Sequence, residues 1–382
     1  MKILFCTPYP PFKEFGGAKV VVELAEAMTE IGCDCQLIGP PDLLNEAEQT
    51  LTGEAFRGQY AQRLRDYLQH HAAEYDVVDY DHVYLPFPRT DFPSQPLFVA
   101  RSVLLAHYLE TIPLPIEQTW RSRIRHWLKG RQERAINQRI VQQAQTTIQE
   151  ADLVNVSNEH DKAELVKFGI PASKVLVLPY GLSQERLQTF TTFDPTPPPQ
   201  PTVCFIGTFD ARKGSTDFPG ILEQIHRQVP QANFLLIGTR QEKAQIMATL
   251  PAKLADAVQV ISQYSTDQLP QFLKTGSVGI FPSYYEGFPF GVLEMLAAAI
   301  PVVAYDSPGP SMMLPSNFLV PLADAQALAQ RVVELLKDSI ALAKSRQWAK
   351  ARSTQFQWQP IAMQTQAKYV EYDRQRLLSR SP

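Results

Sequence analysis

The organisation of the chain is clearest from one segment, Phe281-Pro-Ser-Tyr-Tyr-Glu-Gly-Phe-Pro-Phe-Gly-Val-Leu-Glu294. It follows a short apolar run, Gly276–Ile280, that predicts a buried strand, and it continues through Met295–Ile300 as a helix. Pro301–Ala304 then predicts a second buried strand. Strand, helix and strand in this order indicate a parallel sheet, and such sheets bind ligands beside the ends of their strands.

Two carboxylates frame this connection, Glu286 in the loop and Glu294 in the first turn of the helix. Each can accept hydrogen bonds from hydroxyl groups of one small ligand, while unpaired N–H groups at the helix N-terminus suit an anionic group. A nucleotide sugar carries both hydroxyl and phosphate groups. In the simpler interpretation, Glu294 only complements the helix dipole and Glu286 is a solvated loop residue.

The spacing Glu286-x7-Glu294, with Pro282-Ser283 before it and an alanine-rich helix after it, resembles the signature of retaining glycosyltransferase family 4. Members of that family have the GT-B fold. The resemblance implies that Glu286 is catalytic, lying beside the donor sugar, and that Glu294 binds the ribose. It also implies donor contacts for the other residues of the connection, namely Ser283, Gly287, Phe288, Phe290, Gly291 and Val292.

A second predicted strand-to-helix loop, Thr208–Gly214, follows the apolar run Thr202–Gly207. A cationic side chain over such a loop can clamp a diphosphate. The resembling family has an arginine at the position of Thr208, and the neighbouring Arg212 can supply that missing charge.

We therefore expect donor binding by four residues of this region and by two that follow the predicted strand Val258–Ile261. They are Gly207, Thr208, Arg212, Lys213, Gln263 and Tyr264. Lys213 is also expected to be catalytic, because it would stabilise the departing diphosphate. The alternative is an ordinary basic pair on the surface.

The first half opens with a strand, a loop ending in Gly16-Gly17 and the helical pattern Ala18–Ile31, as in a Rossmann-like domain. The paired glycines let the backbone approach a ligand closely. The resemblance places them beside the donor, whereas the simpler interpretation is a plain turn. Family members often carry a histidine where this chain has Val103, so His107 is the candidate catalytic imidazole, with His82 as a second candidate and a structural role as the alternative for both.

Two further patterns in the first half left alternatives open. Asp79-Tyr-Asp81 has the form of a divalent-metal motif, although this spacing is common. Trp120–Arg139 carries seven basic residues against one acidic residue, with two tryptophans on one helical face. Such a helix suits an anionic membrane surface or a phosphate-bearing acceptor, and equally a solvated helix with its tryptophans packed inward.

A chain of 382 residues with 45% hydrophobic and 20% charged residues predicts two globular domains. The proline-rich segment Asp194–Pro201 suggests the boundary. We expect an N-terminal domain over 1–193, a donor domain over 194–355 and a last helix, about 356–382, that crosses back to the first domain. The net charge of −3 argues against nucleic-acid binding, and the four cysteines read as core thiols of a cytoplasmic protein.

These patterns predict an α/β protein with two Rossmann-like domains, and the resemblance implies that the domains face each other across a cleft. The function expected from the resemblance is transfer of a sugar from a nucleoside diphosphate sugar to a saccharide or lipid-linked acceptor, with retention of configuration. No cofactor and no metal would be needed, and any peripheral attachment to the membrane would be through the basic segment. Three rivals are a sugar-nucleotide epimerase of the same fold, a non-catalytic binding subunit and a metal-dependent transferase built on Asp79 and Asp81.

Overall fold

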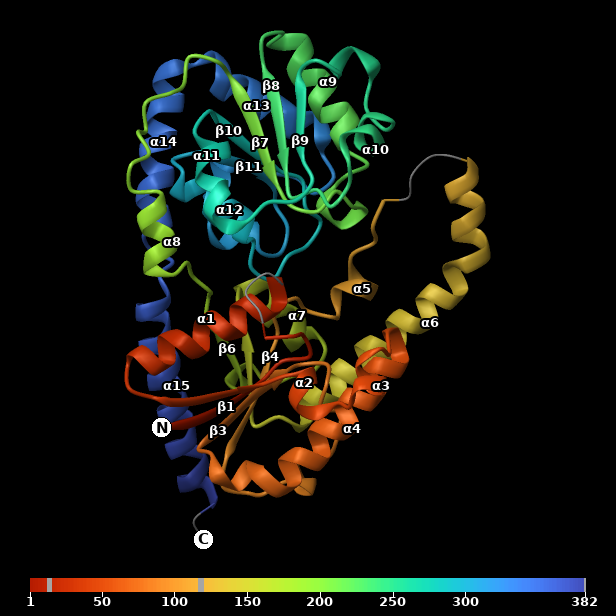
Figure 1. The fold of residues 1–382 in the computed structure, drawn as a ribbon, viewed down its shortest axis with the longest axis vertical. Coiled ribbons are helices and arrows are strands. Elements are labelled where there is room, and N and C mark those ends of the chain that lie inside the picture. The colour runs from red at the N-terminus through yellow and green to blue at the C-terminus, as the bar shows by residue number, and fades with distance from the viewer. Residues whose placement is uncertain (12–15, 116–119, 381–382) are drawn as a thin grey trace. The chain divides into compact units, whose positions relative to one another are not determined.

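The structure is a computed structural model that describes residues 1–11, 16–115 and 120–380, without the side chains of 120–129, 377, 379 and 380. It divides into two compact units (Figure 1). Unit 1 comprises Met1–Thr111, Gln132–Ser183 and Gln357–Pro382. Unit 2 comprises Ile112–Arg131 and Gln184–Phe356. Each unit contains one six-stranded parallel sheet, which confirms the predicted α/β class with two Rossmann-like halves.

The sheet of unit 1 has the strand order β2-β1-β3-β4-β5-β6. In chain order its strands are β1 (Lys2–Cys6), β2 (Asp34–Ile38), β3 (Val77–Asp81), β4 (Leu97–Arg101), β5 (Leu153–Val156) and β6 (Val175–Val177). Its helices include α1 (Gly16–Glu30), α2 (Pro40–Leu43), α3 (Glu46–Gln49), α4 (Gly53–His71), α5 (Tyr108–Thr111), α7 (Glu159–Lys167) and α15 (Trp358–Arg380). The long helix α6 (Trp120–Glu150) contributes its second part to this unit.

The sheet of unit 2 has the order β12-β11-β10-β7-β8-β9. Its strands are β7 (Thr202–Ile206), β8 (Asn233–Ile237), β9 (Val258–Ile261), β10 (Val278–Phe281), β11 (Val302–Tyr305) and β12 (Leu319–Val320). Its helices include α8 (Gln184–Thr189), α9 (Phe218–Gln228), α10 (Lys243–Met247), α11 (Leu269–Leu273), α12 (Phe290–Ala297), α13 (Ala325–Lys337) and α14 (Ser339–Ser353).

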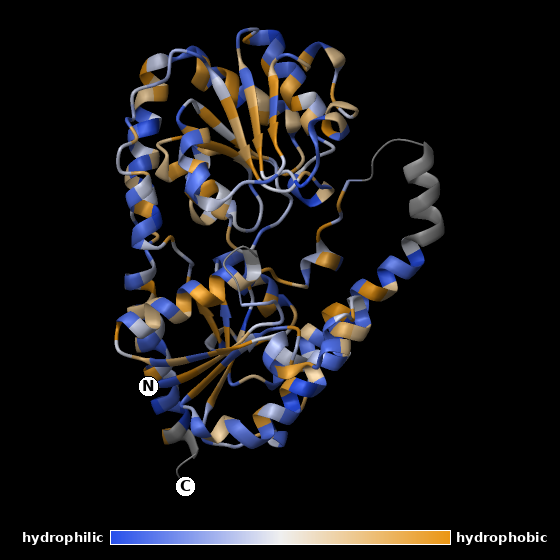
Figure 2. Cartoon of the chain, viewed as in Figure 1, coloured by the Kyte–Doolittle hydropathy of each residue, from blue (hydrophilic) through white to orange (hydrophobic). Residues whose placement is uncertain are grey.

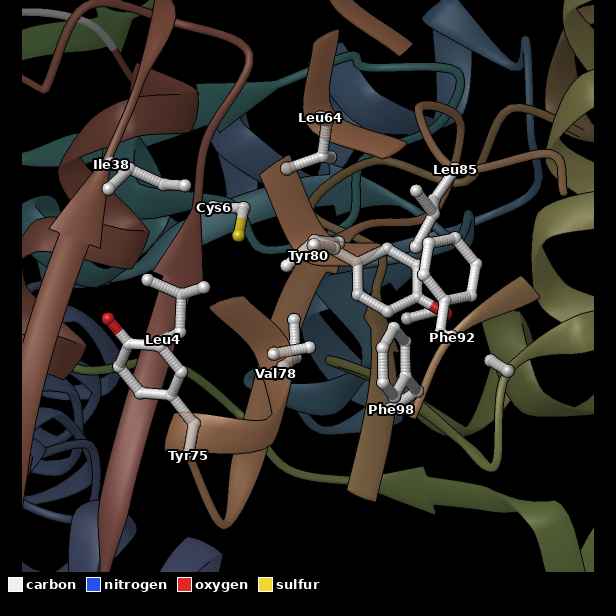
Figure 3. Close-up of a cluster of buried hydrophobic side chains, with 14 of the residues drawn as sticks. Leu4, Cys6, Ile38, Leu64, Tyr75, Val78, Tyr80, Leu85, Phe92 and Phe98 are labelled. Carbon is white, nitrogen blue, oxygen red and sulfur yellow. The ribbon is translucent and has the colours of Figure 1, made fainter. Parts of the chain in front are cut away.

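Burial explains why the strands read as apolar runs without alternation. Both faces of a parallel sheet are covered, so its central strands are hydrophobic on both sides. The strands are accordingly the most hydrophobic parts of each unit in Figure 2. In unit 1, one face carries a cluster that includes Leu4, Val78, Tyr80, Phe92 and Phe98, which converge in Figure 3.

The last helix, α15, belongs to unit 1, where it packs against α1. The indole Nε1 of Trp358 donates a hydrogen bond of 2.7 Å to Glu23. Further along the helix, the hydroxyl of Tyr369 donates one of 2.7 Å to Asp79 in β3. These buried polar contacts fix the returning helix to the sheet of the first unit.

The proline-rich segment belongs to unit 2, and the chain leaves unit 1 earlier, between Ser183 and Gln184. The guanidinium of Arg346 in α14 donates to the main-chain oxygens of Asp194 and Pro195 at 3.2 and 3.0 Å. It also donates to the oxygen of Gly276 at 2.7 Å. The two units thus divide ahead of the boundary expected at residue 194, and the prolines lie in an anchored segment of unit 2.

Candidate functional site

The connection from β10 to α12 forms the centre of the candidate site in unit 2. Ser283 and Glu286 lie in this loop, and both are buried, with Glu286 only 7% exposed. The main-chain N–H of Glu286 donates to the oxygen of Pro308 at 3.0 Å, which holds the loop against the residues that follow β11. A carboxylate buried to this degree needs compensating partners.

Glu286 finds those partners in the loop after β7. Its Oε1 lies 2.6 Å from Nζ of Lys213 and 2.7 Å from a guanidinium nitrogen of Arg212. The hydroxyl of Ser283 donates a further hydrogen bond to the same oxygen at 2.5 Å. The structure therefore brings together four predicted site residues from two strand ends into one charge-paired cluster.

The charges of this cluster depend on one another. Burial opposes ionisation of Glu286, but Lys213 and Arg212 outweigh it and hold the pKa of this carboxyl below its ordinary value. Burial lowers the pKa of Lys213, an effect that Glu286 opposes and Arg212 reinforces. Asp210, in the same loop, also acts on both cations, so two cations and two carboxylates lie close together at this strand end.

The loop after β7 is held against the β10–α12 connection by close backbone packing. It contains a short 3₁₀ turn, η4 (Ala211–Lys213), which Asp210 caps by accepting from the N–H of Lys213 at 3.1 Å. Gly214 follows with φ of +80°, and a β-carbon there would lie 2.2 Å from the oxygen of Pro282. Only glycine therefore fits at this position, and its small size lets Arg212 and Lys213 reach Glu286.

Lys213 lies directly over the end of the sheet. Its Nζ is 4.8 Å from the centre of the Phe281 ring, and its Cε would lie 3.5 Å from a β-carbon on Gly207. The predicted donor residue Thr208 instead donates to Asp210 at 2.5 Å. The resembling family has an arginine in place of Thr208. The side chain of Arg212 is not free to take its place, because it is bound to Glu286 and to the oxygen of Tyr285.

The start of α12 differs from the expected row of unpaired N–H groups. The N–H of Val292 donates to the oxygen of Pro289 at 2.9 Å, and that of Phe290 donates to the oxygen of Phe288 at 3.0 Å. Gly291 packs so closely on β7 that a β-carbon would lie 2.6 Å from the oxygen of Ile206. Gly287 lies between the Glu286 cluster and the edge-to-face ring pair of Phe288 and Phe290, whose centres are 4.9 Å apart.

Glu294 lies on α12 and is buried. It is paired with Arg186, a residue that the sequence did not predict as part of the site. A guanidinium nitrogen of Arg186 in α8 donates to Oε1 of Glu294. Tyr264, which follows β9, lies close enough that Glu294 adds to the effect of burial in raising the pKa of its hydroxyl. Gln263, beside it, is exposed. No local pattern around α8 pointed to Arg186, which is 108 residues from Glu294 in sequence.

The paired glycines of unit 1 lie beside a separate pocket at the ends of β1, β3 and β4. Gly16 begins α1, and Gly17 lines the pocket together with Tyr9, Asp81 and Val103. A β-carbon on Gly17 would lie 2.8 Å from the ring of Tyr9, so the glycine permits this ring to cover the helix start. Burial raises the pKa of Asp81 to about 7.

The predicted metal motif is engaged in other contacts. Arg101 in β4 donates to both oxygens of Asp79, at 3.0 and 2.6 Å, and Tyr369 donates to the second of them. In the part of the chain that the structure describes, no three histidine, cysteine, aspartate or glutamate residues form a group that could hold a metal. Both aspartates line the pocket, but Asp79 is held in a buried ion pair with Arg101.

Neither candidate histidine has the environment of a catalytic group. His107 is 0% exposed, its Nε2 lies 2.9 Å from Oε1 of Gln145, and its ring packs edge-on against Phe168 at 4.5 Å. Burial lowers its pKa. His82 is also buried, and its Nε2 accepts from the N–H of Ala106. Both imidazoles therefore pack within unit 1, and the expectation of a catalytic His107 gains no support.

The basic segment is described only in part. The side chains of 120–129, including both tryptophans, lie outside the described residues. Arg131, Arg134 and Arg139 are exposed, and Arg139 lies 2.8 Å from Glu54. Among the helices that the structure describes, none combines the length and the apolar character that a membrane crossing requires.

Comparison with known proteins finds similarity to glycosyltransferases. Residues 200–338 match the family model described as Glycosyl transferases group 1. The glycogen synthase of Mycobacterium tuberculosis is 24% identical over 279 residues, which cover 70% of this chain and 65% of the relative. The curated relatives that match are covered over 29% to 65% of their own length, less than two thirds.

Solved structures extend the similarity to the whole chain. Sucrose-phosphate synthase from Thermosynechococcus elongatus has a TM-score of 0.71 at 19% identity, and the match covers 100% of both chains. Anabaena HepE in complex with UDP-glucose has a TM-score of 0.64 at 16% identity, covering 97% of this chain and 100% of that one. At these identities the likeness shows the fold, and the two-domain α/β fold of this chain is GT-B.

Proposed function

We propose that this chain transfers a glycosyl unit from a nucleoside diphosphate sugar to a saccharide or lipid-linked acceptor, with retention of configuration. The observation that carries the proposal is the cluster of Lys213, Arg212 and Glu286 at the end of β10. A glycosyl transfer breaks the bond between the sugar and the diphosphate, so charge develops on both. The two cations would stabilise the negative charge on the diphosphate, and the carboxylate would stabilise the positive charge on the sugar.

Lys213 and Arg212 would stabilise the departing diphosphate by charge-assisted hydrogen bonds. They lie over a strand end, with Nζ of Lys213 2.6 Å from Oε1 of Glu286, so their charge is fixed before the reaction starts. Electrostatic stabilisation that is already in place requires no reorganisation in the transition state. On this basis the reaction needs no metal ion to neutralise the leaving group.

Glu286 would position the sugar and stabilise the positive charge that develops on its ring. Its pKa is held below the ordinary value by Lys213 and Arg212 against the effect of burial, so the carboxylate form is available near neutral pH. A glycosyl transition state resembles an oxocarbenium ion, which a fixed carboxylate stabilises. Glu294 would bind the ribose hydroxyls, as the family resemblance implies.

The acceptor would bind at the pocket of unit 1. Tyr9 presents an aromatic ring that is 43% exposed, and Asp81 presents a carboxyl group. Aromatic faces and carboxylates are groups that suit sugar rings and hydroxyls, respectively. Arg101, a cation of the pocket lining, is already bound to Asp79, so among the described residues the lining favours an uncharged hydroxyl acceptor.

The first test measures thermal stability with UDP-, GDP-, ADP- and dTDP-sugars, each with and without chelator. A ligand present at about a hundred times its dissociation constant stabilises by roughly 2.7 kcal/mol, which gives a visible shift. We expect one selective donor whose effect survives the chelator and is lost in Lys213→Ala. NMR of the product would then report the anomeric configuration.

Other outcomes would identify the rivals. A changed sugar nucleotide formed without any acceptor would indicate an epimerase. Donor binding with neither hydrolysis nor transfer would indicate a non-catalytic subunit, which Val103 and Thr208 at the positions of two family site residues would then explain. Loss of activity on chelation would contradict the metal-independent reaction.

The basic segment Trp120–Arg139 is proposed to bring the protein to an anionic membrane surface. Arg131 and Arg134 are exposed and close to one another on α6, as such binding requires. Co-sedimentation with vesicles that contain anionic lipid should be lost on reversing both charges. A wild-type protein that never sediments with these vesicles would remove this part of the proposal.

A further inference from the structure

We propose that Arg186 is a positioning residue for the donor nucleotide, which holds the Glu294 carboxylate in the orientation that binds the ribose. This inference rests on the proposed function, since it assigns a role within the same donor site. Arg186 lies on α8, outside the loops at the strand ends and outside the Glu286-x7-Glu294 spacing from which Glu294 was predicted.

The geometry places the two side chains in one buried pair. Arg186 donates from a guanidinium nitrogen to Oε1 of Glu294, and the two side chains are only 9% and 5% exposed. Charged groups buried to this degree are costly unless paired, and removing one partner of such a pair takes away part of the compensation of the other. The position of the Glu294 carboxylate therefore depends on Arg186.

The surroundings of the pair indicate a ligand site. Three strands of the sheet contribute to it, because Tyr264 follows β9, Gly238 follows β8, and Glu294 lies on the helix that follows β10. A β-carbon on Gly238 would lie 3.0 Å from the ring of Tyr264, so these two loops are in close contact. Ligands of parallel sheets bind at such strand ends.

The segment that carries Arg186 is itself anchored in unit 2. Beyond α8, the ammonium of Lys350 in α14 donates to the main-chain oxygens of Thr191 and Phe193. Phe190 packs against Phe193 with ring centres 5.5 Å apart. Arg186 thus lies on a fixed helix, as a residue that orients another side chain must.

Arginine suits this role better than lysine. Its planar guanidinium is always charged and forms directed hydrogen bonds, whereas an ammonium group is a flexible point charge. A carboxylate that is fixed by one such bond keeps its orientation toward the two adjacent hydroxyls of a ribose. Loss of Arg186 should therefore affect recognition of the 2′-hydroxyl more than recognition of the phosphates.

The test uses the full-length protein and isothermal titration with UDP, GDP and ADP, followed by the 2′-deoxy form of whichever binds. We expect the wild type to prefer the ribonucleotide about tenfold. Arg186→Ala should weaken ribonucleotide binding about tenfold and 2′-deoxynucleotide binding much less, so that the ratio of the two dissociation constants approaches one. Arg186→Lys should give an intermediate ratio.

A matched control is available on α13, where Arg331 forms an exposed pair with Glu334 at 3.0 Å. Arg331→Ala should leave both dissociation constants unchanged. The ratio does not depend on the amount of folded protein, so a purely structural role of Arg186 would leave it at the wild-type value and overturn the inference. Tighter binding in Arg186→Ala would also overturn it, because Arg186 would then compete with the ribose.

The two proposals fail differently. If the wild type binds none of the three nucleotides, the proposed function and this inference both fall. If it binds one but does not distinguish it from the 2′-deoxy form, or if Arg186→Ala keeps the wild-type ratio, only the inference falls. Should Arg186→Ala not fold, the ratio measured for Arg186→Lys decides, with an unchanged value counting against the role.

Discussion

The two units place a carboxylate at equivalent places, beside the ends of parallel strands, yet with opposite electrostatics. In unit 2, Glu286 lies within 2.7 Å of Lys213 and Arg212, and these cations hold its pKa below the ordinary value despite burial. In unit 1, burial raises the pKa of Asp81 to about 7, and the N–H of Val83 is the hydrogen-bond donor that opposes this rise.

The difference arises in the loops and the neighbouring strands. Unit 2 directs two cations into its strand-end loop through η4 and Gly214. Unit 1 also has a cation nearby, Arg101, but both oxygens of Asp79 bind it. The same sheet architecture therefore carries a carboxylate paired with two cations in one unit and a carboxylate with a raised pKa in the other.

The largest expected effect comes from removing the carboxylate of unit 2. Glu286→Gln keeps the size of the side chain but removes the charge that would stabilise the sugar cation, so kcat/KM should fall about 10³-fold. Steady-state transfer assays with the donor found in the stability panel measure this. Asp81→Asn is the matched variant in unit 1, and it should leave the nucleotide dissociation constant unchanged. Wild-type activity in Glu286→Gln would break the comparison.

The next effect concerns the ion pair that neutralises Arg101. Arg101→Met leaves Asp79 buried without its charge partner, which should cost about 3–5 kcal/mol of unfolding free energy. Tyr369→Phe removes one hydrogen bond to the same carboxylate and should cost about 1 kcal/mol. Urea unfolding of both variants compares them. If Arg101→Met were as stable as the wild type, Arg101 would be available for an anionic ligand after all.

The pH dependence of stability separates the two carboxylates further. Because the pKa of Asp81 is raised to about 7 in the folded state, the folded protein holds this proton more tightly than the unfolded chain does between about pH 4 and 7. Stability should therefore fall by a few kcal/mol as the pH rises through this window, relative to Asp81→Asn.

Glu286 has the opposite sign. Its pKa is lowered, so its contribution to stability is complete above the unfolded pKa of about 4.3 and is lost only as the pH falls through the lower folded value.

Unfolding midpoints of the wild type and of Asp81→Asn at pH 5 and pH 7.5 measure the effect predicted for Asp81. Parallel behaviour of the two proteins would show that Asp81 is ionised throughout.

The smallest expected effect lies at the aromatic ring of unit 1. Tyr9→Ala should raise the KM for the acceptor about tenfold, corresponding to about 1.4 kcal/mol, and leave the nucleotide dissociation constant unchanged. Tyr9→Phe keeps the ring and should behave like the wild type. A weaker nucleotide dissociation constant in Tyr9→Ala would instead assign this pocket to the donor.

Much of this arrangement could be predicted from local patterns. The apolar runs gave the parallel strands, and the segment from Phe281 to Glu294 gave the loop and helix at the centre of the site. Arg212 and Lys213 could be predicted as a pair of cations in one loop. Their contact with Glu286 could not, because Arg212 and Glu286 are 74 positions apart in sequence. It depends on Gly214, whose close approach to Pro282 has no counterpart in hydrophobic periodicity.

The contacts that sequence reasoning missed are all of long range. Arg186 reaches Glu294 across 108 residues, and Tyr369 reaches Asp79 across 290. His107 showed the reverse problem, since a histidine near a strand end is equally compatible with a site and with a core. Its contacts with Gln145 and Phe168 follow from how helices pack on the sheet, which local patterns do not specify.

The bonds from Arg346 to the proline-rich segment also bear on how such proteins can be recombined. Because this guanidinium binds the oxygens of Asp194 and Pro195, cutting the chain after these residues would separate Arg346 from both acceptors. Such a cut would also leave Arg186 on the wrong fragment. A chimaera that exchanges the donor-side module should therefore carry Gln184–Phe356 as one piece and leave α15 with the recipient.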